Sequence, residues 1–132
     1  MTFVKGLLIA LFMTITLDYL WLGYVVKPFN LSQLSEIGRI SNGQFNIWLP
    51  GALMAYALMA LVLMVFVIPL CADKSLLETA ALGALMGFCV YGIFDMTNAA
   101  ILKNYPMLFA FADMAWGTFL FGATAVTLKY FL

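Results

Sequence analysis

Three aspartates lie inside long apolar stretches of this sequence, where an ionisable side chain is costly. They are Asp18, Asp95 and Asp113, and no histidine, lysine or arginine lies in the hydrophobic centre of these stretches to neutralise them. A charged side chain at the centre of a bilayer costs roughly 2.5–3.5 kcal/mol even on a lenient insertion scale. We therefore expect the three aspartates to form a polar site that the protein uses.

The chemistry open to such a site is that of carboxyl groups. Carboxylates held together in a low dielectric cannot all be ionised, and they then titrate as a set. The set can donate and accept a proton, or it can bind a hard cation through oxygen ligands. The sequence has no histidine, which removes the usual base for a serine or cysteine nucleophile and disfavours zinc, haem and iron–sulfur sites. No phosphate-binding loop or dinucleotide motif is present, so we expect no cofactor.

The composition indicates an integral membrane protein. Hydrophobic residues make up 66% of the 132 residues and charged residues only 9%, whereas a soluble domain has about 25% charged residues. The mean hydropathy is +1.08. This length predicts one domain over residues 1–132. A net charge of zero without a basic run excludes nucleic acid as an expected partner and leaves membrane lipids.

Four apolar segments are each long enough to span roughly 30 Å of hydrocarbon. They cover residues 3–26, 47–70, 77–102 and 107–130. Because backbone groups find no water in lipid and period-2 alternation is absent, we expect an all-α bundle of four transmembrane helices. Ser75 and Glu78 have the spacing of a capping box at the start of the third helix. The first segment has no small-residue cleavage site after Asp18, so we expect a retained helix rather than a signal peptide.

The polar loop 27–46 separates the first two segments. Leu31, Leu34 and Ile37 recur there at helical spacing, which is compatible with a short amphipathic helix on the membrane surface or with a plain connector. Lysines and arginines flank the segments equally at both ends, three on each side, so the positive-inside rule does not fix the orientation. The N-terminal amine favours placing both termini in the cytoplasm.

The three aspartates are expected at one depth. Asp18 precedes Lys27 by nine residues, Asp95 precedes Lys103 by eight, and Asp113 follows Lys103 by ten. At about 1.5 Å per residue, all three lie roughly 12–15 Å below the surface that carries the long polar loop. Accidental polar residues have no reason to share a layer, so we expect the carboxyl groups to converge.

Helical spacing places further residues near the aspartates. Gly83, Gly87, Tyr91, Asp95 and Asn98 follow steps of four or three residues and form one stripe. Gly83-x-x-x-Gly87 is a pattern that permits close helix contact. The stripe that packs against another helix is therefore expected to carry Asp95 as well.

A short motif, Asp-x-x-Trp, occurs twice. It is found at Asp18 and Trp21 and again at Asp113 and Trp116, and in antiparallel helices we expect the two tryptophans at different depths. Trp116 is expected to line a cavity, and Trp48 to lie at the mouth of the second helix. The candidate catalytic residues are Asp95, Asp113 and Asp18, and the candidate ligand-binding residues are Asn98, Trp116, Tyr91, Trp21, Asn46 and Trp48.

Three motifs also carry a resemblance to a known family. They are Asp18-Tyr-Leu-Trp-Leu-Gly23, Tyr91-Gly-Ile-Phe-Asp-Met-Thr-Asn98 and Asp113-Met-Ala-Trp-Gly-Thr118, together with Leu102, Lys103 and Pro106. They resemble domain-of-unknown-function family 2177, small bacterial inner-membrane proteins with four expected helices. The resemblance extends over essentially the whole chain. It implies this topology, the inner membrane and a shared polar centre, and it supplies no activity.

Three functions fit these observations. The first is carboxylate acid–base chemistry on a membrane-soluble lipid or isoprenoid, with Asp95 and Asp113 as the working pair and Asp18 orienting them. The second is a proton- or cation-coupled carrier of small molecules, which could form a homodimer. The third is a non-catalytic binding or assembly subunit. A pocket suited to a lipid favours the first, a path between both surfaces the second, and a filled core the third; whether the chain is an enzyme stays open.

Overall fold

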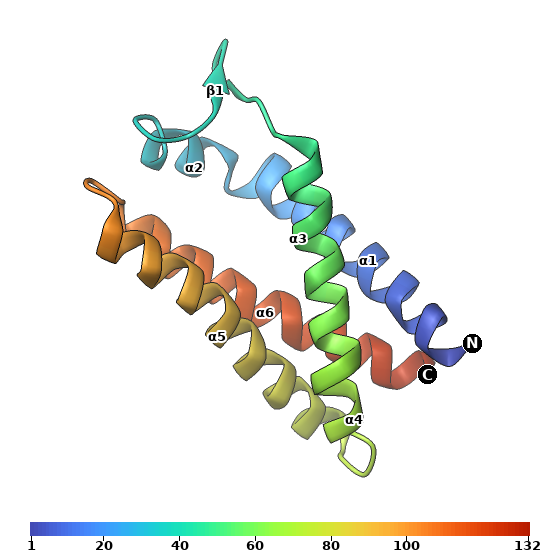
Figure 1. The fold of residues 1–132 in the computed structure, drawn as a ribbon. Helices are drawn as coiled ribbons and strands as arrows, with labels where there is room; N and C mark the ends of the chain where they lie inside the picture. The colour runs from blue at the N-terminus through green and yellow to red at the C-terminus, as the bar shows by residue number, and fades with distance from the viewer.

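Four long helices make up the computed structural model, which describes residues 1–132 (Figure 1). Each is long and apolar enough to cross a membrane, and together they cover Thr2–Val25, Leu49–Leu70, Leu76–Ile101 and Met107–Phe131. These bounds lie within two residues of the predicted segments. The prediction of an all-α bundle with four membrane-spanning helices is confirmed.

The first two spanning helices are interrupted by π-helical turns. The first consists of α1 (Thr2–Leu20) and η1 (Trp21–Val25), and the second of α3 (Leu49–Val62), η2 (Leu63–Val67) and α4 (Ile68–Leu70). The other two, α5 (Leu76–Ile101) and α6 (Met107–Phe131), are uninterrupted. A π-helical turn inserts one extra residue into the α-helical register and is frequent at functional sites.

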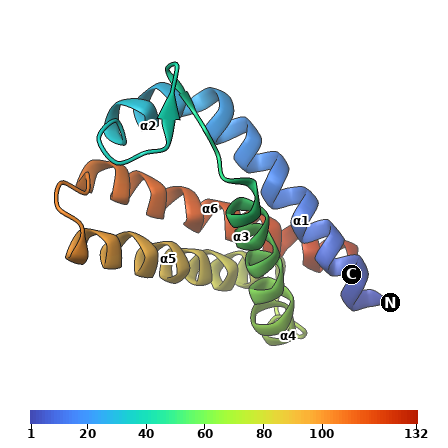
Figure 2. The same cartoon turned by 45° about the horizontal axis from the view of Figure 1, so that its top comes forward.

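Helices α5 and α6 run antiparallel and lie side by side in both views (Figures 1 and 2). A Cβ atom on Gly83 would lie 2.7 Å from the carbonyl oxygen of Phe121, and one on Gly87 would overlap the backbone of Gly117. The missing side chains therefore allow the two backbones to approach closely. The prediction that the Gly83–Gly87 face packs against another helix is confirmed, and the predicted capping box of Ser75 and Glu78 is present as well.

The apolar core fills the end of the bundle that carries both chain termini, the terminal end. Leu63, Val67, Phe121 and Leu128 are fully or almost fully buried there. At the opposite end, called the loop end, the chain leaves α1 and returns to α3, and α5 turns into α6. Both views show α1 diverging from the α5–α6 pair toward this end (Figures 1 and 2), and Figure 1 shows α3 diverging as well.

The polar loop is a short helix followed by a hairpin. Helix α2 covers Lys27–Gln33, and strands β1 (Ile40–Ser41) and β2 (Gln44–Phe45) pair antiparallel. The expected amphipathic helix is therefore shorter than the apolar spacing suggested, because Ile37 lies beyond its end. Asn42 and Gly43 form the hairpin turn with φ of 53° and 71°, the conformation for which an Asn-Gly pair is favoured.

Gly87→Ala should destabilise the fold by about 1–3 kcal/mol, because the new methyl group overpacks the contact with α6. Thermal unfolding in detergent would measure this loss. Gly23→Ala is the control, since a Cβ atom there meets nothing within 4 Å and alanine favours helix. Equal melting temperatures for the two variants would contradict the close α5–α6 packing.

Candidate functional site

Asp95 is a fully buried carboxyl group on α5 that lacks one hydrogen-bond donor. Its exposed fraction is 0%, and the Tyr105 hydroxyl donates to its Oδ1 atom over 2.7 Å. The Oδ2 atom is fully enclosed and receives no donor. Since buried polar atoms are nearly always hydrogen-bonded, this oxygen calls for a partner.

Asp113 on α6 can supply that partner. Its carboxyl group lies close enough to Asp95 to be affected by the charge of that group, and two carboxyl groups can form a hydrogen bond only if one of them carries a proton. Tyr105 lies in the turn between α5 and α6. Partial burial is the main cause that raises the pKa of its hydroxyl, and the hydrogen bond to Asp95 raises this pKa further. Tyr105 therefore stays a proton donor to Asp95.

Asp18 on α1 is in a different state, because both of its oxygens have donors. The Trp116 indole nitrogen donates to Oδ1 over 2.6 Å, and the Tyr56 hydroxyl donates to Oδ2 over 2.9 Å. The side chain is only 4% exposed. Asp18 thus links α1 to α3 and to α6 through hydrogen bonds.

The two tryptophans of the repeated motif stack on one another, which corrects the expectation that they lie at different depths. The ring centroids of Trp21 and Trp116 are 4.6 Å apart, and the ring planes differ by 6°. Side chains of a helix lean toward its N-terminus. In the antiparallel helices α1 and α6, Trp21 therefore leans toward the terminal end and Trp116 toward the loop end, so that their rings meet.

The three carboxyl groups lie near one another without forming a single cluster. Tyr91 lies close enough to all three aspartates to interact electrostatically with them, and Asp113 interacts in the same way with Asp18 and Asp95. No three acidic or cysteine side chains are grouped as ligands for one metal ion. The arrangement is a carboxyl pair beside a separately hydrogen-bonded carboxyl.

The remaining predicted site residues divide into two groups. Asn98 is half-buried, and its side chain lies beside the Tyr105 hydroxyl. Asn46 and Trp48 are exposed and line neither of the two cavities at the aspartates. Their neighbours Gln44 and Phe45 on the hairpin line one of these cavities instead.

Two cavities meet at Asp113. The polar cavity has a volume of about 570 Å³ and lies between the aspartates and the polar loop; its polar lining residues include Asp18, Tyr56, Asp113, Lys27, Asn30 and Gln44. The apolar cavity has a volume of about 380 Å³ and lies between α3 and α5, where Leu58, Met59, Val90 and Phe94 line it. Both volumes are within the range of small-molecule sites. Asp113 and Phe94 line both cavities.

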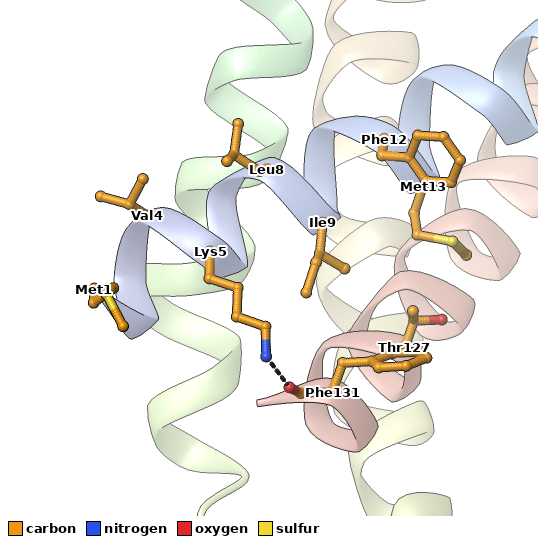
Figure 3. Close-up of a pocket in the computed structure, with 9 residues that line it drawn as sticks. All are labelled: Met1, Val4, Lys5, Leu8, Ile9, Phe12, Met13, Thr127 and Phe131. Atoms are coloured by element: carbon orange, nitrogen blue, oxygen red, sulfur yellow. Dashed lines mark hydrogen bonds between the residues drawn. The ribbon is translucent and has the colours of Figure 1, made fainter.

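A third hollow, of about 600 Å³, lies far from the aspartates between α1 and α6 at the terminal end. Figure 3 shows that Val4, Leu8 and Phe12 belong to its lining and that the Lys5 ammonium group points to the Phe131 carbonyl. That contact is a hydrogen bond of 2.8 Å. Lys5 is the only charged side chain in the lining, which is otherwise mainly hydrophobic.

Sequence reasoning did not select Lys27, Asn30 or Tyr105 as site residues. In a continuous α-helix, Lys27 would lie roughly 180° around the axis from Asp18. The π-helical turn η1 adds one residue to the register between them, which brings the start of α2 toward the Asp18 side. A signal for Tyr105 did exist, because it lies ten residues after Asp95, in the tight turn that directly follows the helix carrying Asp95.

Trp116→Phe should destabilise the protein by about 1–2 kcal/mol, because it leaves a buried oxygen of Asp18 without a donor and weakens the indole stack. Thermal unfolding in detergent measures the loss. Trp48→Phe is the matched control, since Trp48 is 62% exposed. A melting temperature that falls no further for Trp116→Phe than for the control would contradict the role assigned to the indole.

The comparisons with known proteins give one match. The model of a family described as "Predicted membrane protein (DUF2177)" matches residues 3–129. No curated protein and no solved structure matches the chain. The match covers all four spanning helices and the three motifs that carry Asp18, Asp95 and Asp113. This chain therefore belongs to the DUF2177 family of membrane proteins.

Proposed function

We propose that the protein binds a membrane lipid or isoprenoid across its two cavities and exchanges a proton with it through Asp95 and Asp113. The observation that carries the proposal is the position of Asp113. This residue lies in the wall of both cavities and close to Asp95, whose Oδ2 atom is enclosed and has no donor. A ligand lying across the two cavities would pass directly over the carboxyl pair.

The apolar cavity is suited to a hydrocarbon chain. Asp113 is the one acidic residue among its lining residues, and the others are hydrophobic. Leu58 and Phe94 in its wall are also 53% and 57% exposed at the outer surface of the helices. In a bilayer that surface faces lipid, so a chain could enter sideways between α3 and α5 without crossing water.

The carboxyl pair is suited to proton transfer. Asp113 is partly exposed to the cavities, whereas Asp95 is buried behind it and held by Tyr105. Asp113 would give its proton to a basic atom or double bond of the ligand, or accept one from it, and Asp95 would stabilise the resulting state. The doubly hydrogen-bonded Asp18 would fix α1, α3 and α6 around the ligand.

The packing at the terminal end supports this function over a through-going carrier. Buried apolar side chains, among them Leu63, Phe121 and Leu128, fill the bundle between the aspartate layer and the terminal end. The polar cavity extends from the aspartates only toward the polar loop. With the protein in the bacterial inner membrane and both termini in the cytoplasm, as we propose, the polar cavity opens toward the outer face.

Asp113→Asn and Asp95→Asn should fold and insert normally but fail to restore the phenotype of a strain that lacks the gene, because asparagine keeps the shape of the carboxyl group and deletes its proton. The measurement is paired: melting temperature of each purified variant, and rescue at matched expression. Asp73→Asn, exposed in the loop before α5, is the control. Full rescue by both variants would leave only the role of a non-catalytic binding or assembly subunit.

Leu58→Trp should reduce the amount of lipid that co-purifies with the protein at least several-fold, because the indole would occupy the apolar cavity. Native mass spectrometry of the detergent-purified protein counts the retained lipid. Leu53→Trp is the matched control, since Leu53 is on the same helix, is 62% exposed and does not line the apolar cavity. Equal retention by both variants would place the lipid elsewhere.

A further inference from the structure

The wall of the polar cavity opposite the aspartates carries an amide group without a partner. Asn30 on α2 is only 7% exposed, and no hydrogen bond of the structure involves its side chain. Asp95 Oδ2 is the only fully enclosed side-chain polar atom that lacks a partner, so the Asn30 amide must keep access to the cavity that it lines. A buried amide that reaches only a cavity is positioned for a ligand.

Lys27 is the only cation in the wall of this cavity, and its ammonium group is free. The ammonium groups of Lys5 and Lys129 donate to backbone carbonyls, as Figure 3 shows for Lys5. No hydrogen bond and no ion pair engages Lys27, although it lines the polar cavity together with Asp18 and Asp113. Lys27 lies one helical turn before Asn30, so both side chains can reach the same group.

The depth of this cation matches that of lipid headgroups. The first spanning helix ends at Val25, and Lys27 follows two residues later, at the boundary where the polar headgroup region begins. The apolar cavity and Asp113 lie deeper. A lipid with its chain between α3 and α5 would therefore place its headgroup beside Lys27 and Asn30.

Resting on the proposed function, we infer that the polar cavity binds the phosphate group of a lipid headgroup through Lys27 and Asn30. A phosphate offers several acceptor oxygens and a negative charge, which the three donors of an ammonium group and the N–H donors of an amide complement. Gln44 on the hairpin supplies a further amide at the same end of the cavity. The carboxyl pair then faces the part of the ligand between phosphate and hydrocarbon chain.

The experiment compares lipids that differ in the phosphate. Purified full-length protein in detergent is titrated with phosphatidylglycerol and with diacylglycerol of the same acyl chains, and native mass spectrometry measures bound lipid. We expect phosphatidylglycerol to bind at least about tenfold more tightly, a difference of ~1.4 kcal/mol. Lys27→Gln and Asn30→Leu should each remove most of that preference, and the control Lys103→Gln, which does not line the polar cavity, should keep it.

The outcomes separate this inference from the proposed function. If both lipids bind equally, Leu58→Trp blocks both and Lys27→Gln changes nothing, the cavities hold lipid but the phosphate site is refuted. If neither lipid binds, the lipid-binding function fails and the phosphate site fails with it. Inorganic phosphate is the last probe: Lys27-dependent binding of the free ion, undiminished by Leu58→Trp and without any preference between the lipids, would refute a lipid as its source.

Discussion

The carboxyl group of Asp18 constrains the position of three of the four spanning helices. The side chain is only 4% exposed, and each of its oxygens accepts a hydrogen bond from the protein. Tyr56 on α3 and Trp116 on α6 are the donors. These bonds act at the loop end of the bundle, where α1 diverges from the α5–α6 pair (Figures 1 and 2) and apolar packing alone would leave it unattached.

The polar cavity results from the different contacts at the two ends of the bundle, which are apolar packing at the terminal end and hydrogen bonds between side chains at the loop end. At the terminal end, Leu63, Phe121 and their neighbours form a buried apolar cluster, and on α5 the glycines bring its backbone against α6. At the loop end, long polar and aromatic side chains bridge the helices instead of small apolar ones. Such side chains hold helices at a distance, so that space remains between them, and the space that remains is lined by their polar ends.

The sequence was sufficient to predict whatever depends on counting along one helix. The four spans and the glycine face of α5 both follow from periodicity and rise per residue. The positions of Lys27 and Asn30 were missed because the π-helical turn η1 changes the helical register. The residue types of Trp21 to Val25 do not indicate a π-helical turn. Asn46 and Trp48 were placed at the site because the Asn42-Gly43 hairpin turn, which directs Gln44 and Phe45 there instead, was overlooked.

The contrast between Asp18 and the Asp95–Asp113 pair explains why three acids at one depth need not do the same work. The carboxyl group of Asp18 has a donor on each oxygen, so it serves as a fixed link between helices. A pair that shares one proton is satisfied only while that proton stays between the two groups. Anything in the adjoining cavities that competes for the proton therefore acts on the pair and not on Asp18.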